Sequence, residues 1–241
     1  PPPEVSSRTP VLLPPHFFIM DAENTPQLVQ TGPERFEAGL IYRYQMPSGP
    51  GPYPTAVMLH GRMGSEDVMW VFRKTIPRPW LVVAPRAPLP EHGYFSWLPP
   101  PDKWPELAEF GPAVEALPRF LRVLPSLYNA DPERVYLLGF SQGAAVSLAA
   151  ALTTPKLVRG MAGLVGFAPE VAPEQVAGKL EGMPVFMAAG TQDHTVPRDQ
   201  TQFAVDLLRR AGADLDYHEY DSGHKLPAAG ISDLRAWFGA R

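Results

Sequence analysis

The sequence of 241 residues contains no cysteine. This absence excludes a disulfide framework, a thiolate metal site and a cysteine nucleophile. Positive charge is not in excess either, because 21 Lys and Arg stand against 25 Asp and Glu, for a formal net charge of −4. Nucleic-acid-binding proteins normally carry a basic excess or a basic run, so we expect no nucleic-acid partner. The motifs G-x-G-x-x-G, G-x-x-x-x-G-K-[ST] and H-E-x-x-H are also missing, so we expect no cofactor and no metal ion.

One stretch, residues 135–155, has 21 residues without a charge, about the length that crosses a bilayer. It is interrupted by Gly139-Phe140-Ser141-Gln142-Gly143. The first half is typical of a buried strand, and the second of a helix built from strong helix formers. We therefore predict a strand and a helix in a protein core, not a membrane span. The chain starts Pro1-Pro2-Pro3 without a signal-peptide pattern, and we expect a cytoplasmic protein. A signal peptide removed beforehand would leave no trace here.

The hydrophobic pattern predicts an α/β fold, and 45% hydrophobic residues supply a sizeable core. Short apolar runs typical of strands occur at residues 39–44, 54–59, 80–84, 134–140, 160–167, 184–190 and 215–220. Helical patterns lie near residues 65–75, 112–128, 142–153, 198–211 and 230–238. This alternation indicates a mostly parallel central sheet with helices on both faces. Residues 1–241 are predicted to form a single domain. Its 31 prolines favour rigid extended segments, and the Pro-rich residues 1–36 and 85–105 are expected to be loops or edge structure.

Gly139-Phe140-Ser141-Gln142-Gly143 has the pattern G-x-S-x-G between a predicted strand and a predicted helix. A serine on such a sharp turn projects its hydroxyl at the carboxyl end of the sheet. Ser141 is therefore the candidate nucleophile. The alternative is a glycine-rich turn that happens to contain a serine.

A serine nucleophile needs a base and an acid that orients the base, in the chain order Ser, Asp, His. His224 lies in a turn beyond the strand at 215–220, at the sheet edge where active sites of open α/β folds lie. His218 lies within that strand and is expected to pack or to face solvent. Asp193 directly follows the strand at 184–190 and is the candidate acid, the alternative being a turn or capping aspartate of the next helix. His194, next to this acid, could not easily be oriented by it.

The oxyanion formed during acyl transfer needs N–H donors. One is expected from Gln142, the residue after the nucleophile, and the other from the loop His60-Gly61-Arg62-Met63-Gly64 after an early strand. We favour Arg62 for the second donor, with Met63 as the other candidate. His60 is expected to brace this loop through its ring.

Together these segments resemble the phospholipase/carboxylesterase branch of the α/β-hydrolase fold, which includes acyl-protein thioesterases. The matching segments are Leu59-His60-Gly61, Pro85-Arg86-Ala87-Pro88 with Trp97, Asp131-Pro132-Glu133-Arg134-Val135 before the G-x-S-x-G turn, Gly190…Asp193…Val196-Pro197 and Gly223-His224. The resemblance implies metal-free cleavage of carboxylic esters or thioesters, with the Arg62 and Gln142 N–H groups as oxyanion donors. Family members often have Leu-Gly after His-Gly, where this chain has Arg62-Met63-Gly64.

The expected substrate is therefore a small-molecule ester or thioester with a short or medium acyl group. Phe95 and Trp97, in the Pro-rich segment 85–105, are expected to line the acyl site, together with Met63 and Val196; ordinary loop anchoring is the alternative for the aromatic residues. Arg62 is expected either to attract an anionic substrate or to be solvated. Two other functions stay open: a serine peptidase or acylaminoacyl hydrolase, which uses the same three groups, and a non-catalytic binding member of the fold. The oligomeric state is not predicted.

Overall fold

A computed structural model describes residues 25–100 and 103–241. An eight-stranded sheet runs through the molecule in the order β1-β2-β4-β3-β7-β8-β9-β10. Its strands are β1 (Gln27–Val29), β2 (Tyr42–Gln45), β3 (Tyr53–Leu59), β4 (Leu81–Pro85), β7 (Ala130–Phe140), β8 (Gly160–Leu164), β9 (Pro184–Gly190) and β10 (Asp214–Tyr220). The strands from β4 to β10 pair in parallel, and β1 and β2 add antiparallel at one edge. The predicted fold class is confirmed.

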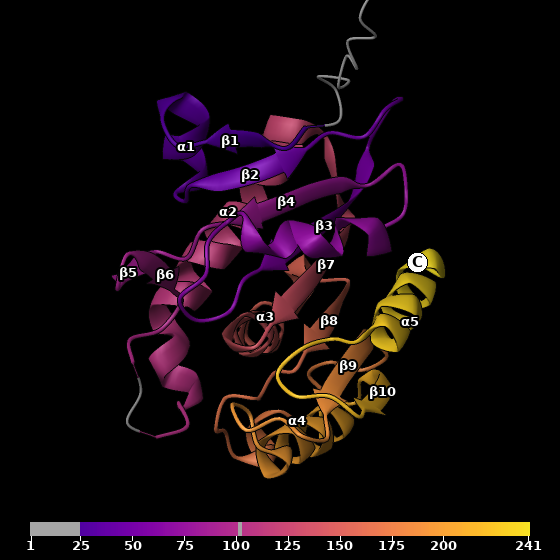
Figure 1. The fold of residues 1–241 in the computed structure, drawn as a ribbon. Coiled ribbons are helices and arrows are strands. Elements are labelled where there is room, and N and C mark those ends of the chain that lie inside the picture. The colour runs from indigo at the N-terminus through magenta and orange to yellow at the C-terminus, as the bar shows by residue number, and fades with distance from the viewer. Residues whose placement is uncertain (1–24, 101–102) are drawn as a thin grey trace, which may run out of the picture.

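Most helices lie between two strands in the sequence, and the last one follows the final strand. They are α1 (Gly32–Ala38), α2 (Gly111–Tyr128), α3 (Gln142–Thr153), α4 (Arg198–Arg210) and α5 (Ala228–Gly239), with a 3₁₀ segment η2 (Val68–Thr75) and shorter turns. Figure 1 shows α1 and the β1–β2 pair at one end of the sheet, and β10 with α4 at the other.

The sheet is covered on both faces, which explains the apolar runs of its central strands. Every residue of β3, β4, β8 and β9 is buried. Successive residues of a strand point to opposite faces. Accordingly, Val57 and Leu59 join a core that includes α2, α3 and α4, whereas Ala56 and Met58 join a second core with η2 and α5.

The N-terminal Pro-rich segment was expected to consist of loops or edge structure, and this is confirmed in part. Residues 27–29 form the edge strand β1. Residues 32–38, however, form helix α1. This helix ends at Gly39, whose left-handed backbone (φ 77°) lets its N–H bond to Arg35 O. Residues 1–24 of this segment lie outside the described residues.

A separate two-stranded hairpin forms within the second Pro-rich segment, where loops or edge structure were expected. Its strands are β5 (Leu89–Glu91) and β6 (Tyr94–Ser96), joined by His92 and Gly93, both with positive φ. Two such residues are what a type I′ hairpin turn requires. Residues 101–102 of this segment lie outside the described residues.

The uncharged run at 135–155 contains the end of β7 and helix α3, as predicted. Within the described ranges, no helix combines the length and the apolar character needed to cross a membrane.

Candidate active site

Ser141 lies on a tight turn between β7 and α3. Its backbone has φ 52° and ψ −117°, a conformation that non-glycine residues rarely adopt, and its N–H donates to Leu164 O over 2.9 Å. The turn requires the flanking glycines, because a Cβ at Gly139 would overlap the Gly143 carbonyl, and a Cβ at Gly143 would overlap the Leu59 carbonyl. The backbone is therefore held in a strained shape that presents Ser141 at the carboxyl end of β7.

Asp193 and His224 are brought together by two neighbouring strands. Strands β9 and β10 pair in parallel with Gly190 opposite Tyr220, so the loops that follow them leave the sheet side by side. The Gln192 N–H donates to Ser222 O over 3.0 Å and ties these loops to each other. In this arrangement His224 Nδ1 lies 2.7 Å from Asp193 Oδ2.

Asp193 is buried, and its two oxygens have different partners. Oδ1 accepts the N–H groups of Thr195 (2.8 Å) and Val196 (3.0 Å), while Oδ2 faces His224. Asp193 thus stabilises the turn before α4 and also contacts the imidazole of His224. The carboxylate at Nδ1 favours the tautomer with the proton on Nδ1, which leaves Nε2 free to accept a proton.

His224 also lies beside the serine turn. Its ring meets the ring of Phe140, the residue before Ser141, edge to face at 5.3 Å between centroids. Within the described ranges, no hydrogen bond joins Ser141 Oγ to His224. Hydrogen bonds of this kind are often long in free enzymes and tighten only with substrate bound.

The remaining histidines near this edge have other surroundings. His218 is half-buried on β10, where Nε2 lies 2.8 Å from Asp216 Oδ1 and the ring stacks on Tyr220. His194 is exposed. Of these three histidines, only His224 forms a side-chain hydrogen bond with Asp193.

The loop after β3 runs alongside Ser141, because β3 pairs in parallel with β7 and Leu59 lies opposite Gly139. A Cβ at Gly61 would lie 3.3 Å from the Cβ of Ser141. The peptide that joins Gly61 to Arg62 is therefore next to the candidate nucleophile.

His60 fixes the orientation of this peptide. Its ring is fully buried, with Nε2 accepting the Ala87 N–H (3.0 Å) and Nδ1 2.7 Å from Gly61 O. Burial lowers the pKa of His60 to about 4, so the ring is neutral and Nδ1 carries the proton. A trans peptide is planar, so a Gly61 C=O turned toward His60 turns the Arg62 N–H the opposite way.

The hydrogen bonds distinguish the two candidates for the second oxyanion donor. The Met63 N–H donates to Ser96 Oγ over 3.0 Å, whereas the Arg62 N–H has no hydrogen-bond acceptor among the described residues. The Gln142 N–H is at the first position of α3, where a helix leaves its N–H groups without an internal acceptor. The free donors are thus those of Arg62 and Gln142.

Trp97 has a different place from the one expected. It is 0% exposed, its indole N–H donates to His60 O (2.9 Å), and its backbone N–H donates to Gln142 Oε1 (2.8 Å). We correct the expected substrate contact: Trp97 packs behind the site and holds the side chain of Gln142.

The other expected substrate-binding residues also differ in accessibility. Val196 is only 3% exposed and supports the Asp193 turn through its N–H, so it offers little surface to a substrate. Phe95 is half-buried under the guanidinium of Arg86, 4.4 Å from the ring centroid. Met63 is exposed and presents its side chain at the surface.

The side chain of Arg62 is half-exposed and pairs with an acidic side chain. Its Nε donates to Glu91 Oε1 over 2.8 Å, and Glu91 is almost buried. This pairing lowers the pKa of the Glu91 carboxyl. Sequence reasoning missed Glu91 and Ser96. Both residues contact the loop across 29 to 33 positions of sequence, so no local pattern indicated them.

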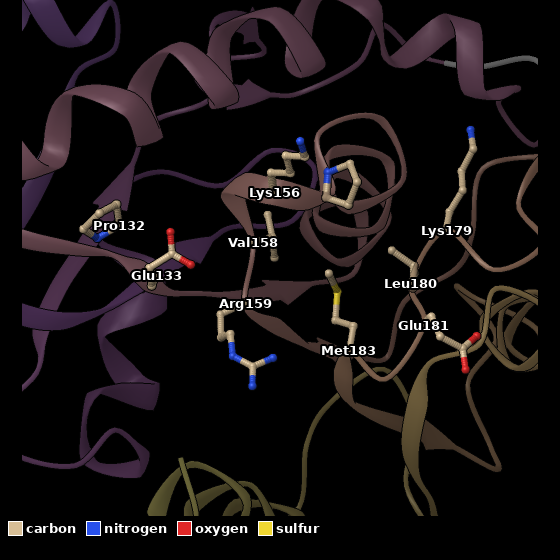
Figure 2. A pocket seen from close by; sticks show the side chains of 10 residues that line it. Pro132, Glu133, Lys156, Val158, Arg159, Lys179, Leu180, Glu181 and Met183 are labelled. Carbon is tan, nitrogen blue, oxygen red and sulfur yellow. The ribbon is translucent and has the colours of Figure 1, made fainter.

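Within the described ranges, no group of three or more His, Asp or Glu side chains is arranged to hold a metal ion. A cavity of about 300 Å³ lies at the amino ends of β7, β8 and β9, whereas Ser141 lies at the carboxyl end of β7. Figure 2 shows the side chains that line it, which include Glu133, Arg159 and Glu181. None of the candidate catalytic residues borders this cavity.

Known proteins resemble this chain in sequence and in fold. The sequence model of the phospholipase/carboxylesterase family matches residues 115–238, more than half of the chain. Carboxylesterase SOBER1 of Arabidopsis thaliana is 30% identical over 116 residues, which cover 47% of this chain and 51% of the relative. Acyl-protein thioesterase 1 of Kluyveromyces lactis is 34% identical over 133 residues, 50% of this chain and 58% of the relative. The chain thus spans about half the length of the curated relatives it matches.

A solved structure, a carboxylesterase from Mesorhizobium loti, has a TM-score of 0.77 at 22% identity and covers 90% of this chain and 99% of its own. The Bacillus cereus carboxylesterase has the same TM-score at 21% identity, with 86% and 96% covered. At this identity the likeness is one of fold. With the family match, it shows that this chain belongs to the phospholipase/carboxylesterase family of the α/β-hydrolase fold.

Proposed function

We propose that the protein is a serine hydrolase that cleaves carboxylic esters and thioesters through an acyl-enzyme on Ser141. The observation that carries the proposal is the 2.7 Å contact between His224 Nδ1 and Asp193 Oδ2, beside a strained turn that bears a serine. The names of relatives support the substrate class, since they include carboxylesterases and acyl-protein thioesterases. One relative is named a probable inactive carboxylesterase, so family membership alone does not carry the activity.

In the proposed reaction, His224 Nε2 takes the proton of Ser141 as Oγ attacks the acyl carbonyl carbon. The negative charge moves to the carbonyl oxygen, where the N–H groups of Arg62 and Gln142 bind it. Collapse of this tetrahedral intermediate breaks the bond to the leaving group, and His224 gives its proton to the departing alcohol or thiol. Water then attacks the acyl-enzyme, again with His224 as base, and releases the acid and Ser141.

Asp193 has two roles in the proposed reaction. Its carboxylate keeps the proton of His224 on Nδ1 and stabilises the imidazolium that forms in each half-reaction. Its other oxygen accepts two backbone N–H groups, which fixes the carboxylate in place. The base is therefore held before substrate arrives.

We further propose that the acyl group is short or medium in length. Phe95 lies on the β5–β6 hairpin, beside the loop at residues 60–64 that we call the oxyanion loop. The backbone of the hairpin is hydrogen-bonded to this loop, since the Gly64 N–H donates to Phe95 O over 3.1 Å. Because this hairpin is hydrogen-bonded to the loop at residues 60–64, we expect it to form one side of a preformed acyl-binding slot and not a mobile lid. Such a slot favours short or medium acyl groups.

The single-domain organisation and the cytoplasmic location remain predictions.

The proposal is tested by turnover of nitrophenyl esters with acetyl, butyryl, octanoyl and palmitoyl groups, together with the thioester and the anilide of the best acyl group. We expect kcat/KM to be highest for butyryl or octanoyl, with the thioester cleaved and the anilide much slower. A preference for emulsified palmitoyl ester would contradict the proposed acyl length. Faster cleavage of the anilide would favour the peptidase alternative, and no turnover of any substrate would favour a binding protein.

A further inference from the structure

We infer that Glu91 and Ser96, on the two strands of the β5–β6 hairpin, are positioning residues that hold the Arg62 N–H toward the oxyanion. The inference rests on the proposed function, because it assigns both residues to the same site. Neither side chain is a candidate to touch the reacting atoms. Each acts through the loop that follows β3.

The first contact is the ion pair between Arg62 and Glu91. Nε of Arg62 donates to both carboxylate oxygens of Glu91, over 2.8 and 3.1 Å, and Nη2 adds a further hydrogen bond to Oε1. Glu91 is 8% exposed, while the Arg62 side chain is 44% exposed. A carboxylate with so little access to water is costly without a partner, so the pair keeps Arg62 at this place.

The second contact runs through Ser96, which is fully buried. Its hydroxyl donates to Glu91 Oε2 and accepts the Met63 N–H over 3.0 Å. A hydroxyl has a single hydrogen, and once that hydrogen points at the carboxylate its lone pairs are left for Met63. Glu91 therefore holds the side chain of residue 62 directly and the following peptide through Ser96.

Together with His60, these contacts hold the backbone on both sides of Arg62. On the preceding side, Gly61 O faces His60 Nδ1. On the following side, the Met63 N–H is bound by Ser96, and Gly64 pairs with Phe95 by backbone hydrogen bonds of 3.0 and 3.1 Å. A donor held rigidly before the reaction stabilises the transition state without reorganisation.

The test compares the wild-type enzyme with Glu91→Gln, using a butyryl ester and an alkyl boronic acid, whose tetrahedral adduct resembles the intermediate. Glutamine keeps the size of the side chain and removes its charge. We expect kcat to fall about tenfold or more, a part of the 10²–10³ lost when one oxyanion donor is removed. KM should change less than twofold, and boronic acid affinity should fall with kcat/KM. Glu133→Gln, near the amino end of β7, is the matched control and should leave kcat, KM and boronic acid affinity unchanged.

A further variant keeps the inference testable if Glu91→Gln does not fold. Ser96→Ala keeps the Arg62–Glu91 pair but removes the acceptor of the Met63 N–H, and should also lower kcat with little change in KM.

The inference would be overturned by a kcat of Ser96→Ala within twofold of wild type. It would also be overturned by a folded Glu91→Gln variant whose kcat is within twofold of wild type. Failure of the proposed function has a different signature, since the wild-type protein would then show no turnover and no boronic acid binding.

Discussion

Replacing Ser141 by alanine should lower kcat for a butyryl ester by a factor on the order of 10⁶, the loss seen in a subtilisin without its serine. The physical reason is that no other group in the site can form the acyl-enzyme. His224 and the two N–H donors would remain, so slow hydrolysis above the rate in water should persist. The measurement is the steady-state rate with a matched control, Ser126→Ala, which alters an exposed serine on α2.

The same position gives an independent check on the strained turn. Alanine at φ 52° and ψ −117° keeps the strain, whereas glycine adopts this conformation freely. Ser141→Gly should therefore unfold in urea with a free energy about 1–2 kcal/mol higher than Ser141→Ala, although both are inactive. Equal stability of the two variants would contradict the strained turn, and full activity of either would remove Ser141 from the mechanism.

Replacing Asp193 by asparagine should lower kcat about 10⁴-fold, as the corresponding change does in a chymotrypsin-like triad. The amide oxygen of the introduced asparagine can still accept the N–H groups of Thr195 and Val196, so the turn should be retained. Its NH₂ then faces His224 Nδ1 and donates to it. The imidazole proton is forced onto Nε2, and the base can no longer accept the proton of Ser141.

The tautomer explanation makes this variant distinct from a simple loss of stability. Thermal unfolding of Asp193→Asn should stay close to wild type, and Asp206→Asn, on the exposed face of α4, should be fully active. A value of kcat within tenfold of wild type would show that Asp193 does not orient the base. A large drop in melting temperature would show that its role is to hold the turn.

The sheet and the serine turn could be predicted from the sequence because each is encoded locally. Apolar runs mark strands buried on both faces, and these runs match β3, β4 and β9 closely, whereas β7 begins four residues before its predicted run at 134–140. The G-x-S-x-G pattern needs only the close approach of its own glycines and of β3. The pairing of Asp193 with His224 followed from a general rule, since carboxyl ends of parallel strands meet at one edge of a sheet.

The support behind the site could not be predicted, because it depends on contacts between distant segments. Trp97 is an aromatic residue in a Pro-rich stretch, and nothing local indicates that it donates to His60 and to Gln142. The ion pair of Arg62 with Glu91 joins residues 29 positions apart through a hairpin that the sequence pattern did not reveal. Helix α1 was missed because its proline content suggested a loop, although proline is well tolerated in the first turn of a helix.

The most direct test of the central claim is covalent labelling with a fluorophosphonate, followed by mass spectrometry of the digested protein. An activated serine attacks the probe, and an ordinary serine does not. The account predicts a single adduct on Ser141 in the wild-type protein, its loss in Ser141→Ala, and strongly slowed labelling in Asp193→Asn. Wild-type protein that stays unlabelled, or that carries the adduct on another residue, would contradict it.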